Sequence, residues 1–269
     1  MSRVTAAIVA LGVLALSGVA SAQFFRGPST ADHMATPESF DGKWHYCRAV
    51  RRQNPRGDGG NWLTDYPLAD RDLSVRFAEL TKTSVSFDKS GEPNYLIVRL
   101  TDEELYQCPI ILMQEVGSLF LSDTDAATLR TYFLKGGFLW VDDFWGSYAW
   151  DVFATEMRKV FPPSEYPIFD VPPDHAIYHT MFDLKGVLQV PSINFWFNTG
   201  GTSERGFDSA QVHARGIADR NGRLMVFATH NTDVSDSWER EGEDPQYFYA
   251  FSPGGYQVAM NVLLYAMTH

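Results

Sequence analysis

The sequence predicts an α/β fold built on an open, mostly parallel β-sheet. Between Trp44 and Val160, short segments rich in aromatic and β-branched residues alternate with longer segments whose apolar residues recur at helical spacing. The segment Pro109–Met113 is apolar at every position, as a parallel strand covered on both faces requires. This alternation of strands and helices is typical of parallel sheets with helices on their faces.

The elements of the first half follow in order along the chain. Asp70 lies at the start of the first helix, where a carboxylate interacts favourably with unpaired amides. Ser122 and Asp125 have the spacing of a capping box for the second helix, and Gly136 supplies a left-handed stop after it. The predicted strands are Trp44–Val50, Tyr95–Leu100, Pro109–Met113 and Phe138–Val141, and the predicted helices run from about Asp70, from Ala126 to Phe133 and from about Tyr148 to Val160.

The second half of the chain is less regular. Residues 219–222 have the composition of a hairpin turn, so we expect a hairpin of Gly216–Ala218 and Arg223–Ala228. Gly255–Thr268 is apolar on nearly all sides, which predicts a buried terminal helix. Residues 231–253 are acidic and aromatic, and we expect them to form a long loop.

The first residues carry the pattern of an export signal. Arg3 precedes a short apolar stretch, and Ala20-Ser21-Ala22 is a small-residue cleavage site. No later apolar segment approaches the roughly 18 residues that a spanning helix needs. We therefore expect a signal peptide at residues 1–22, a linker at residues 23–42 and a single domain at residues 43–269. The domain would be periplasmic or extracellular, with no stable membrane span after cleavage.

The composition is that of an acidic globular protein. The net charge of −11 argues against binding to nucleic acid or to an anionic membrane surface. An oxidising compartment would allow Cys47 and Cys108 to form a disulfide bond. Buried free cysteines are also common, so the sequence leaves both states open. The absence of a Cys-x-x-Cys pair argues against a thiolate zinc site.

Asp142 and Asp143, at the carboxyl end of Phe138–Val141, are the strongest site candidates in the sequence. Ligands of open α/β sheets bind beyond the carboxyl ends of the strands. Two carboxylates there can bind a cation or divide the roles of acid and base. Because neighbouring side chains of a strand point to opposite faces, one carboxylate can cap the next helix while the other faces a cleft. Capping or structural pairing of both is the alternative.

Histidines provide further candidates. His175 and His179 would share one face of a helix, as a metal site can require. The two prolines before them make a helix uncertain, and no His-Glu-x-x-His pattern is present. His230 and Asp233 follow the strand that ends at Ala228, where polar side chains reach the mouth of a cleft. Structural or surface positions are the alternative for all of them.

Aromatic residues near carboxylates are candidate ligand contacts, because an aromatic ring can cover the apolar face of a sugar. Packing in the core and loops is the alternative. The sequence contains no glycine-rich phosphate loop and no Gly-x-Ser-x-Gly elbow, and neither cysteine lies at a strand-to-helix turn near a histidine. The candidates are Trp62, Asp65, Tyr66, Trp145, Tyr178, Trp196, Asp233 and Trp238.

Four segments of the sequence form a distinctive set, namely Gly60–Pro67, Leu129–Asp143, Asp174–His179 and Asn261–Ala266, and the Gly-Gly-Phe-Leu-x-x-Asp-Asp block is the most specific part. Together they resemble a bacterial family named domain of unknown function 4159. The resemblance covers the chain from about Gly42 to its end. It implies kinship with class I glutamine amidotransferase-like and trehalose-utilisation-type domains, and hence a flavodoxin-like three-layer sandwich.

Amidotransferases of that superfamily place a cysteine nucleophile at a strand-to-helix elbow. This sequence has Asp142-Asp143 at the corresponding kind of place and no cysteine there. The resemblance therefore does not extend to glutamine hydrolysis.

These observations predict an exported binding domain that recognises a small polar ligand, a sugar or an envelope component without chemistry. The first alternative is a hydrolase, with or without a metal ion, that uses Asp142 and Asp143 with His175 and His230. The second alternative is a partner subunit of an envelope complex. We expect no cofactor, and the sequence predicts no metal site.

Overall fold

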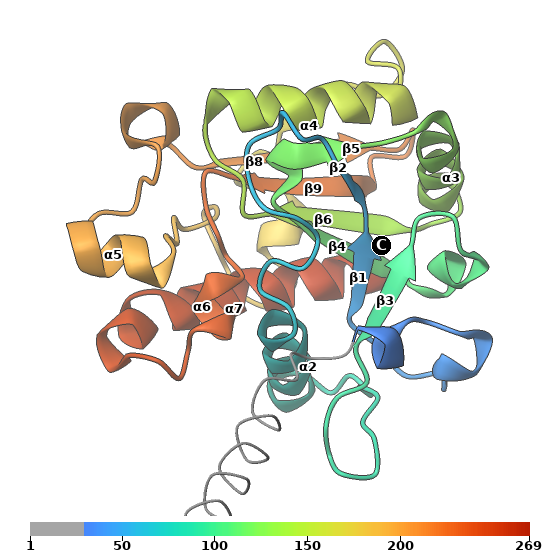
Figure 1. Ribbon diagram of the computed structural model, residues 1–269, viewed down its shortest axis with the longest axis horizontal. Coiled ribbons are helices and arrows are strands. Elements are labelled where there is room, and N and C mark those ends of the chain that lie inside the picture. The colour runs from blue at the N-terminus through green and yellow to red at the C-terminus, as the bar shows by residue number, and fades with distance from the viewer. Residues whose placement is uncertain (1–29) are drawn as a thin grey trace, which may run out of the picture. The chain divides into compact units, whose positions relative to one another are not determined.

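The computed structural model describes residues 30–269 and divides the chain into two compact units, Met1–His33 and Met34–His269. The described part of the first unit contains the 3₁₀ helix η1 (Ala31–His33). All elements below belong to the second unit (Figure 1). The predicted signal peptide, residues 1–22, lies outside the described residues.

A seven-stranded sheet forms the centre of the second unit. Its strands are β1 (Cys47–Val50), β3 (Leu96–Arg99), β4 (Ile110–Gln114), β6 (Phe138–Asp142), β7 (Phe169–Asp170), β8 (His213–Ala218) and β9 (Leu224–His230). They lie in the order β3-β1-β4-β6-β9-β8-β7. The five strands from β3 to β9 are parallel, whereas β8 pairs antiparallel with both β9 and β7.

The five parallel strands have the order of a flavodoxin-like sheet. Numbered by their place in the chain, they read 2-1-3-4-5 across the sheet. The direction of the connections reverses between β1 and β4, and such folds bind ligands beyond the carboxyl ends of the strands at this reversal. The predicted mostly parallel sheet is therefore confirmed.

Helices cover both faces of the sheet, with α4 (Gly146–Val160) on one side and α7 (Pro245–Thr268) on the other (Figure 1). α3 (Asp123–Leu134) packs with α4, and its Leu129 and Phe133 enter the core on that side. α2 (Leu68–Leu80) lies on the α7 side, where Leu73 and Phe77 share a second core with Trp140. The sheet is therefore the middle layer of a three-layer sandwich, and its central strands are buried on both faces.

Local signals set the ends of α3 as the sequence predicts. Ser122 accepts a hydrogen bond from the Asp125 N–H, and the Asp125 side chain accepts one from the Ser122 N–H, which completes the capping box. Gly136, with a φ of 109°, then turns the chain into β6.

The prediction of a long loop at residues 231–253 is wrong. α6 (Asp236–Glu239) forms within this segment, and α7 begins at Pro245 rather than at Gly255. Asp244 caps α7 by accepting hydrogen bonds from two backbone amides. The sequence pattern misplaces the start because α7 contains Pro253, and a proline disfavours a helix interior.

The predicted C-terminal hairpin is confirmed, since β8 and β9 pair antiparallel with Ala218 opposite Leu224. The structure also contains further short elements. They are β2 (Arg52–Gln53) with its antiparallel partner β5 (Leu119–Phe120), α5 (Ile193–Thr199), and the 3₁₀ helices η2 (Pro37–Ser39), η3 (Glu103–Gln107), η4 (Val116–Ser118), η5 (Ala176–Tyr178) and η6 (Gly206–Ser209).

Cys47 in β1 and Cys108, which directly precedes the segment leading into β4, form a disulfide bond, so the bonded state is the one found. Met34, within the predicted linker of residues 23–42, forms a parallel bridge with Ile97 and therefore lies beside β3. Among the described helices, none combines the length and the apolar character needed to cross a membrane.

Candidate functional site

Left-handed backbone conformations gather at the carboxyl edge of the sheet. Glu115, Asp143 and Asn231 directly follow β4, β6 and β9, with φ angles of 55°, 53° and 64°. Asp65, with a φ of 61°, lies in the connection from β1 to α2. Each such residue costs on the order of 1–2 kcal/mol. The rest of the fold holds strained turns at this edge, as it often does at functional sites.

Carboxylates from three connections converge at the same edge. One oxygen each from Asp65, Asp143 and Asp233 lie within 4.8 Å of one another. In a second group, one oxygen each from Asp65, Asp236 and Glu239 also lie within 4.8 Å of one another, so Asp65 belongs to both groups. Four of these residues are buried, and Asp65 is partly exposed. We call the five residues the acidic cluster, the first three the inner group and the second three the outer group.

Asp143 is held at the turn from β6 to α4. Its N–H donates to the Thr232 carbonyl at 3.2 Å, and its own carbonyl accepts from the Glu115 N–H at 3.0 Å. The indole N–H of Trp145 donates to Asp143 Oδ1 at 3.1 Å. These contacts fix both the backbone and the carboxylate, so Asp143 is preorganised within the inner group.

Asp142 supports the cluster from the next position. Its Oδ1 accepts from the Thr229 hydroxyl at 2.5 Å, and its Oδ2 accepts from the Ser235 N–H at 2.9 Å. These bonds tie β6 to β9 and to the segment that carries the outer group. The capping alternative requires that Asp142 or Asp143 cap α4. Neither does so, and the N–H of Gly146 donates to Asn231 instead.

Asp65 reaches the cluster from the β1–α2 connection. The side-chain amide of Gln114 donates to Asp65 Oδ2 at 2.6 Å. Gln114 Oε1 in turn accepts from Arg48 at 2.7 Å, and Arg48 also donates to the Thr64 carbonyl at 2.8 Å. Arg48 forms a buried ion pair with Asp70. This guanidinium therefore orients the connection, while Asp70 already balances its charge.

Asp233 is oriented by its own segment. Its Oδ1 accepts from the Ser235 hydroxyl at 2.8 Å and from the Asp236 N–H at 3.0 Å. Within the described chain, no Lys or Arg nitrogen lies within the 4.0 Å of an ion pair from the carboxylates of Asp143 or Asp233. The inner group therefore collects negative charge without a contacting cationic side chain.

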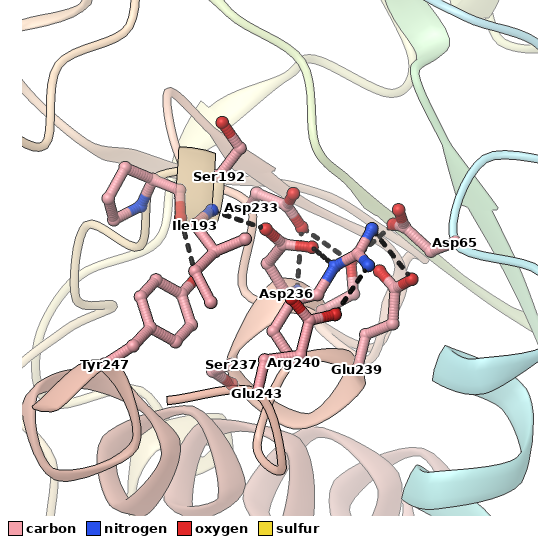
Figure 2. A network of polar contacts seen from close by, with 12 residues as sticks. Asp65, Ser192, Ile193, Asp233, Asp236, Ser237, Glu239, Arg240, Glu243 and Tyr247 are labelled. Atoms are coloured by element: carbon pink, nitrogen blue, oxygen red, sulfur yellow. Dashed lines mark hydrogen bonds and ion pairs between the residues drawn. The ribbon is translucent and has the colours of Figure 1, made fainter. Parts of the chain in front are cut away.

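The outer group has a cationic partner in Arg240 (Figure 2). Arg240 Nε lies 3.4 Å from Asp236 Oδ1, and Nη2 lies 3.1 Å from Glu239 Oε1. Glu239 Oε2 has no hydrogen-bond donor among the described residues. The carboxyl groups of Glu239 and Asp65 also form a hydrogen bond with each other, which needs a proton, and the raised pKa of Glu239 places that proton on Glu239. Even the outer group is therefore only partly neutralised.

Burial raises the pKa of all five carboxyl groups in the acidic cluster, and burial is the largest cause in each case. The pKa of Asp236 rises to about 6, and that of Glu239, which also lies beside Asp65, rises to about 10. Burial also raises the pKa of Asp142 to about 7. Such a cluster holds protons near neutral pH unless a cation replaces them.

The spacing of both groups suits a hard divalent cation. Calcium–oxygen distances are about 2.3–2.6 Å, so oxygens on opposite sides of one ion lie up to about 5 Å apart. The oxygens of each group lie within 4.8 Å of one another, which is compatible with that distance. Carboxylates are also the ligands that calcium and magnesium prefer.

His230 lies away from the acidic cluster. Its ring faces α4, packs on Phe144 with ring centroids 4.9 Å apart, and lies 2.9 Å from the Gly146 carbonyl. Burial lowers its pKa to about 4. His230 is therefore a neutral packing residue on the opposite face of β9 from Thr229.

His175 lies at the other end of the sheet. Its ring is 5.5 Å from that of Tyr265, whose hydroxyl accepts from the N–H of Leu224, the first residue of β9. His179 contacts Asp183 at 2.7 Å on the surface. The hydrolase alternative requires His175 and His230 to lie close to Asp142 and Asp143. The structure does not bring them together.

Three of the six aromatic candidates are buried, and the other three are partly exposed. Trp145 contacts the acidic cluster through Asp143. Trp62 and Tyr66 lie around Arg48. The remaining three pack against other aromatic rings, and they are Tyr178, Trp196 and Trp238.

Asp236, Glu239 and Arg240 are not among the predicted site residues, because they lie farther than Asp233 from the predicted strand that ends at Ala228. Asp233, Asp236 and Glu239 recur every three residues, a spacing that places side chains on one side of a helical turn. That spacing is the signal that could have identified the outer group.

A protein-family model matches most of the chain. The model of a family described as a domain of unknown function (DUF4159) matches residues 49–267. No curated protein matches the chain.

Proposed function

The chain belongs to the family described as a domain of unknown function (DUF4159), and we propose that it is a binding domain that holds a divalent cation at the carboxyl edge of its sheet. The observation that carries this proposal is the inner group. Asp65, Asp143 and Asp233 come from three separate connections and place oxygens within 4.8 Å of one another.

The energetics of burial support a cation. A buried carboxylate without a partner is costly, so each one either keeps a proton or binds a positive charge. A divalent ion among three carboxylates replaces several protons at once and satisfies oxygens that otherwise repel one another. The fixed backbone around Asp143 means that little reorganisation would accompany binding.

The partly exposed Asp65 supplies the approach from solvent. An ion held by three carboxylates keeps other coordination positions for oxygen ligands, since calcium takes about 6–8. Hydroxyl groups of a small polar ligand, a sugar or an envelope component can fill those positions. The proposed function is therefore cation-dependent binding of a polar ligand, without hydrolysis.

Two further proposals concern setting and ancestry. The apolar start of the sequence supports export, and the bond between Cys47 and Cys108 is compatible with an oxidising compartment. The 2-1-3-4-5 strand order and the elbow at Asp143 support kinship with glutamine amidotransferase-like domains. An aspartate at that elbow argues against amidotransferase chemistry in this chain.

Calorimetric titration of the chelator-treated protein with Ca²⁺ tests the cation. We expect one ion per chain, with a dissociation constant of roughly 10⁻⁷–10⁻⁵ M, the range of protein calcium sensors. Asp143→Asn and Asp65→Asn should each weaken binding at least about tenfold, which corresponds to about 1.4 kcal/mol. Both variants preserve the size of the side chain and remove one negative charge.

Asp170→Asn is the matched control. Asp170 is an aspartate that pairs with Arg215 and lies outside the acidic cluster, so its replacement should leave Ca²⁺ affinity unchanged. The proposal fails if the wild-type protein gives no binding isotherm with Ca²⁺, Mg²⁺ or Mn²⁺. It also fails if Asp170→Asn weakens binding as much as Asp143→Asn does.

A further inference from the structure

Arg240 lies where a second cation would otherwise fit in the acidic cluster. We propose that the Arg240 guanidinium acts as a built-in second cation for the outer group and thereby limits the cluster to one bound metal ion. This inference rests on the proposed function, because it concerns the number of ions that the same cluster takes. It identifies Arg240 as the residue that determines the stoichiometry of the site.

The outer group has the same geometry as the inner group. The ligand oxygens of Asp65, Asp236 and Glu239 lie within 4.8 Å of one another, as those of the inner group do. Glu239 is only 7% exposed, and its Oε2 has no donor among the described residues. A buried carboxylate oxygen without an N–H or cationic donor, on a side chain that lies beside the Asp65 carboxyl group, is the state expected of a ligand atom. Spacing and ligand type therefore do not distinguish the outer group from the inner one.

The difference between the groups is the guanidinium. Arg240 contacts Asp236 and Glu239 from one side of the outer group, at 3.4 Å and 3.1 Å (Figure 2). A second ion there would lie next to this fixed positive charge and would share both carboxylates with it. Because like charges repel strongly at such distances in a buried site, the guanidinium excludes the ion.

Arg240 is anchored so that it stays in this position. Its third contact is Glu243, whose carboxylate lies 2.9 Å from Nη1. The planar guanidinium can contact three carboxylates at once, which a lysine ammonium cannot do with the same geometry. About a third of the side chain is exposed, so the charge is introduced from the surface into the buried group.

Removal of the charge gives a direct test by ion stoichiometry. The wild-type protein should bind one Ca²⁺ per chain in calorimetric titration and one Mn²⁺ per chain by electron paramagnetic resonance. Arg240→Met, which preserves the length and removes the charge, should bind two ions of either kind. Arg240→Gln should also bind two, and it retains hydrogen-bonding capacity if the methionine variant does not fold. Arg240→Lys keeps the charge and should bind one.

Arg76→Met is the matched control, because Arg76 forms an ion pair with Glu241 at 3.1 Å outside the acidic cluster and should leave the stoichiometry at one. If folded Arg240→Met and Arg240→Gln bind one ion like the wild-type protein, the inference is overturned and the proposed function stands. Two ions in the wild-type protein also overturn it. No ion in the wild-type protein overturns the proposed function itself.

Discussion

Asn231 supports the candidate site although it lies outside the acidic cluster. It directly follows β9 in a left-handed conformation, with a φ of 64°. Its Oδ1 accepts from the N–H of Gly146, the first residue of α4, and its Nδ2 donates to the Gln211 carbonyl, both at 2.7 Å. One buried side chain therefore joins the end of β9 to the start of α4, between which Asp143 is held.

Two substitutions at Asn231 separate its hydrogen bonds from its backbone conformation. Asn231→Ala loses two buried hydrogen bonds and keeps a Cβ in the left-handed region, so it should destabilise the fold by about 2–4 kcal/mol. Asn231→Gly loses the same bonds but adopts a positive φ without strain, and it should be about 1 kcal/mol less destabilising. Urea denaturation measures both. Equal losses, or a larger loss for glycine, would contradict this account.

Some of the site residues predicted from the sequence belong to the acidic cluster, and others do not. Asp143 and Asp233 are candidates in the sequence because each follows a predicted strand, and Asp65 is a candidate because it lies among aromatic residues of a predicted loop. His230 is selected by the same argument, yet its ring faces α4 while Thr229 faces Asp142. The side to which a side chain points at a strand end depends on the strand's register, which residue type alone does not determine.

At the scale of elements, α7 depends on a cap that the sequence pattern conceals. Asp244 Oδ1 accepts from the N–H groups of Gln246 and Tyr247, at 2.8 Å and 3.0 Å. Pro245 occupies the first helical position, where its missing N–H is not needed. These two residues start the helix before Pro253 interrupts its hydrogen-bonding pattern.

Replacement of the cap tests this origin of α7. Asp244→Ala leaves two amides without their acceptor and should cost about 1 kcal/mol, or roughly 2–4 °C in melting temperature for a chain of this size. Asp244→Ser keeps an acceptor at the cap and should cost clearly less. Thermal unfolding followed by circular dichroism measures both variants. A melting temperature unchanged in Asp244→Ala would show that tertiary packing alone sets the start of the helix.

Elements with a strong local pattern were predictable from the sequence. β4 and β6 are apolar except for their last residues, Gln114 and Asp142, and α3 has a capping box at one end and Gly136 after the other. α5 and the pair of β2 and β5 are short and are stabilised by contacts with distant segments, which periodicity in a single stretch does not reveal. The missed elements are thus those whose stability is not local.

At the scale of the whole molecule, the acidic cluster is a product of topology. The connections that carry Asp65, Asp143 and Asp233 follow β1, β6 and β9, which the parallel sheet aligns with their carboxyl ends at one edge. The chain places these carboxylates far apart in sequence, and only the strand order brings them together. The candidate residues were therefore accessible from the sequence, whereas their grouping was not.

This grouping predicts how stability depends on pH. The carboxyl groups of the cluster have raised pKa values in the folded protein, whereas in the unfolded chain they ionise near pH 4. The folded state therefore binds more protons, and its stability is complete below about pH 4 and is lost as pH rises toward the folded values. Asp142 and Glu115, whose pKa values burial raises to about 7, add to this loss.

The melting temperature in EDTA should consequently fall by about 5–10 °C between pH 6.5 and pH 8. The lowered pKa values of His45, His175, His213 and His230 act in the opposite sense, but mostly below about pH 6.5, so the carboxyl groups dominate in this interval. Millimolar Ca²⁺ should reduce the fall, because the ion replaces the protons that the cluster loses. Asp143→Asn should also reduce it in EDTA, because one titrating group is gone. A melting temperature in EDTA that stays level or rises over this interval would mean that the buried carboxylates are not protonated in the folded protein, and the case for an ion in their place would lose its physical basis.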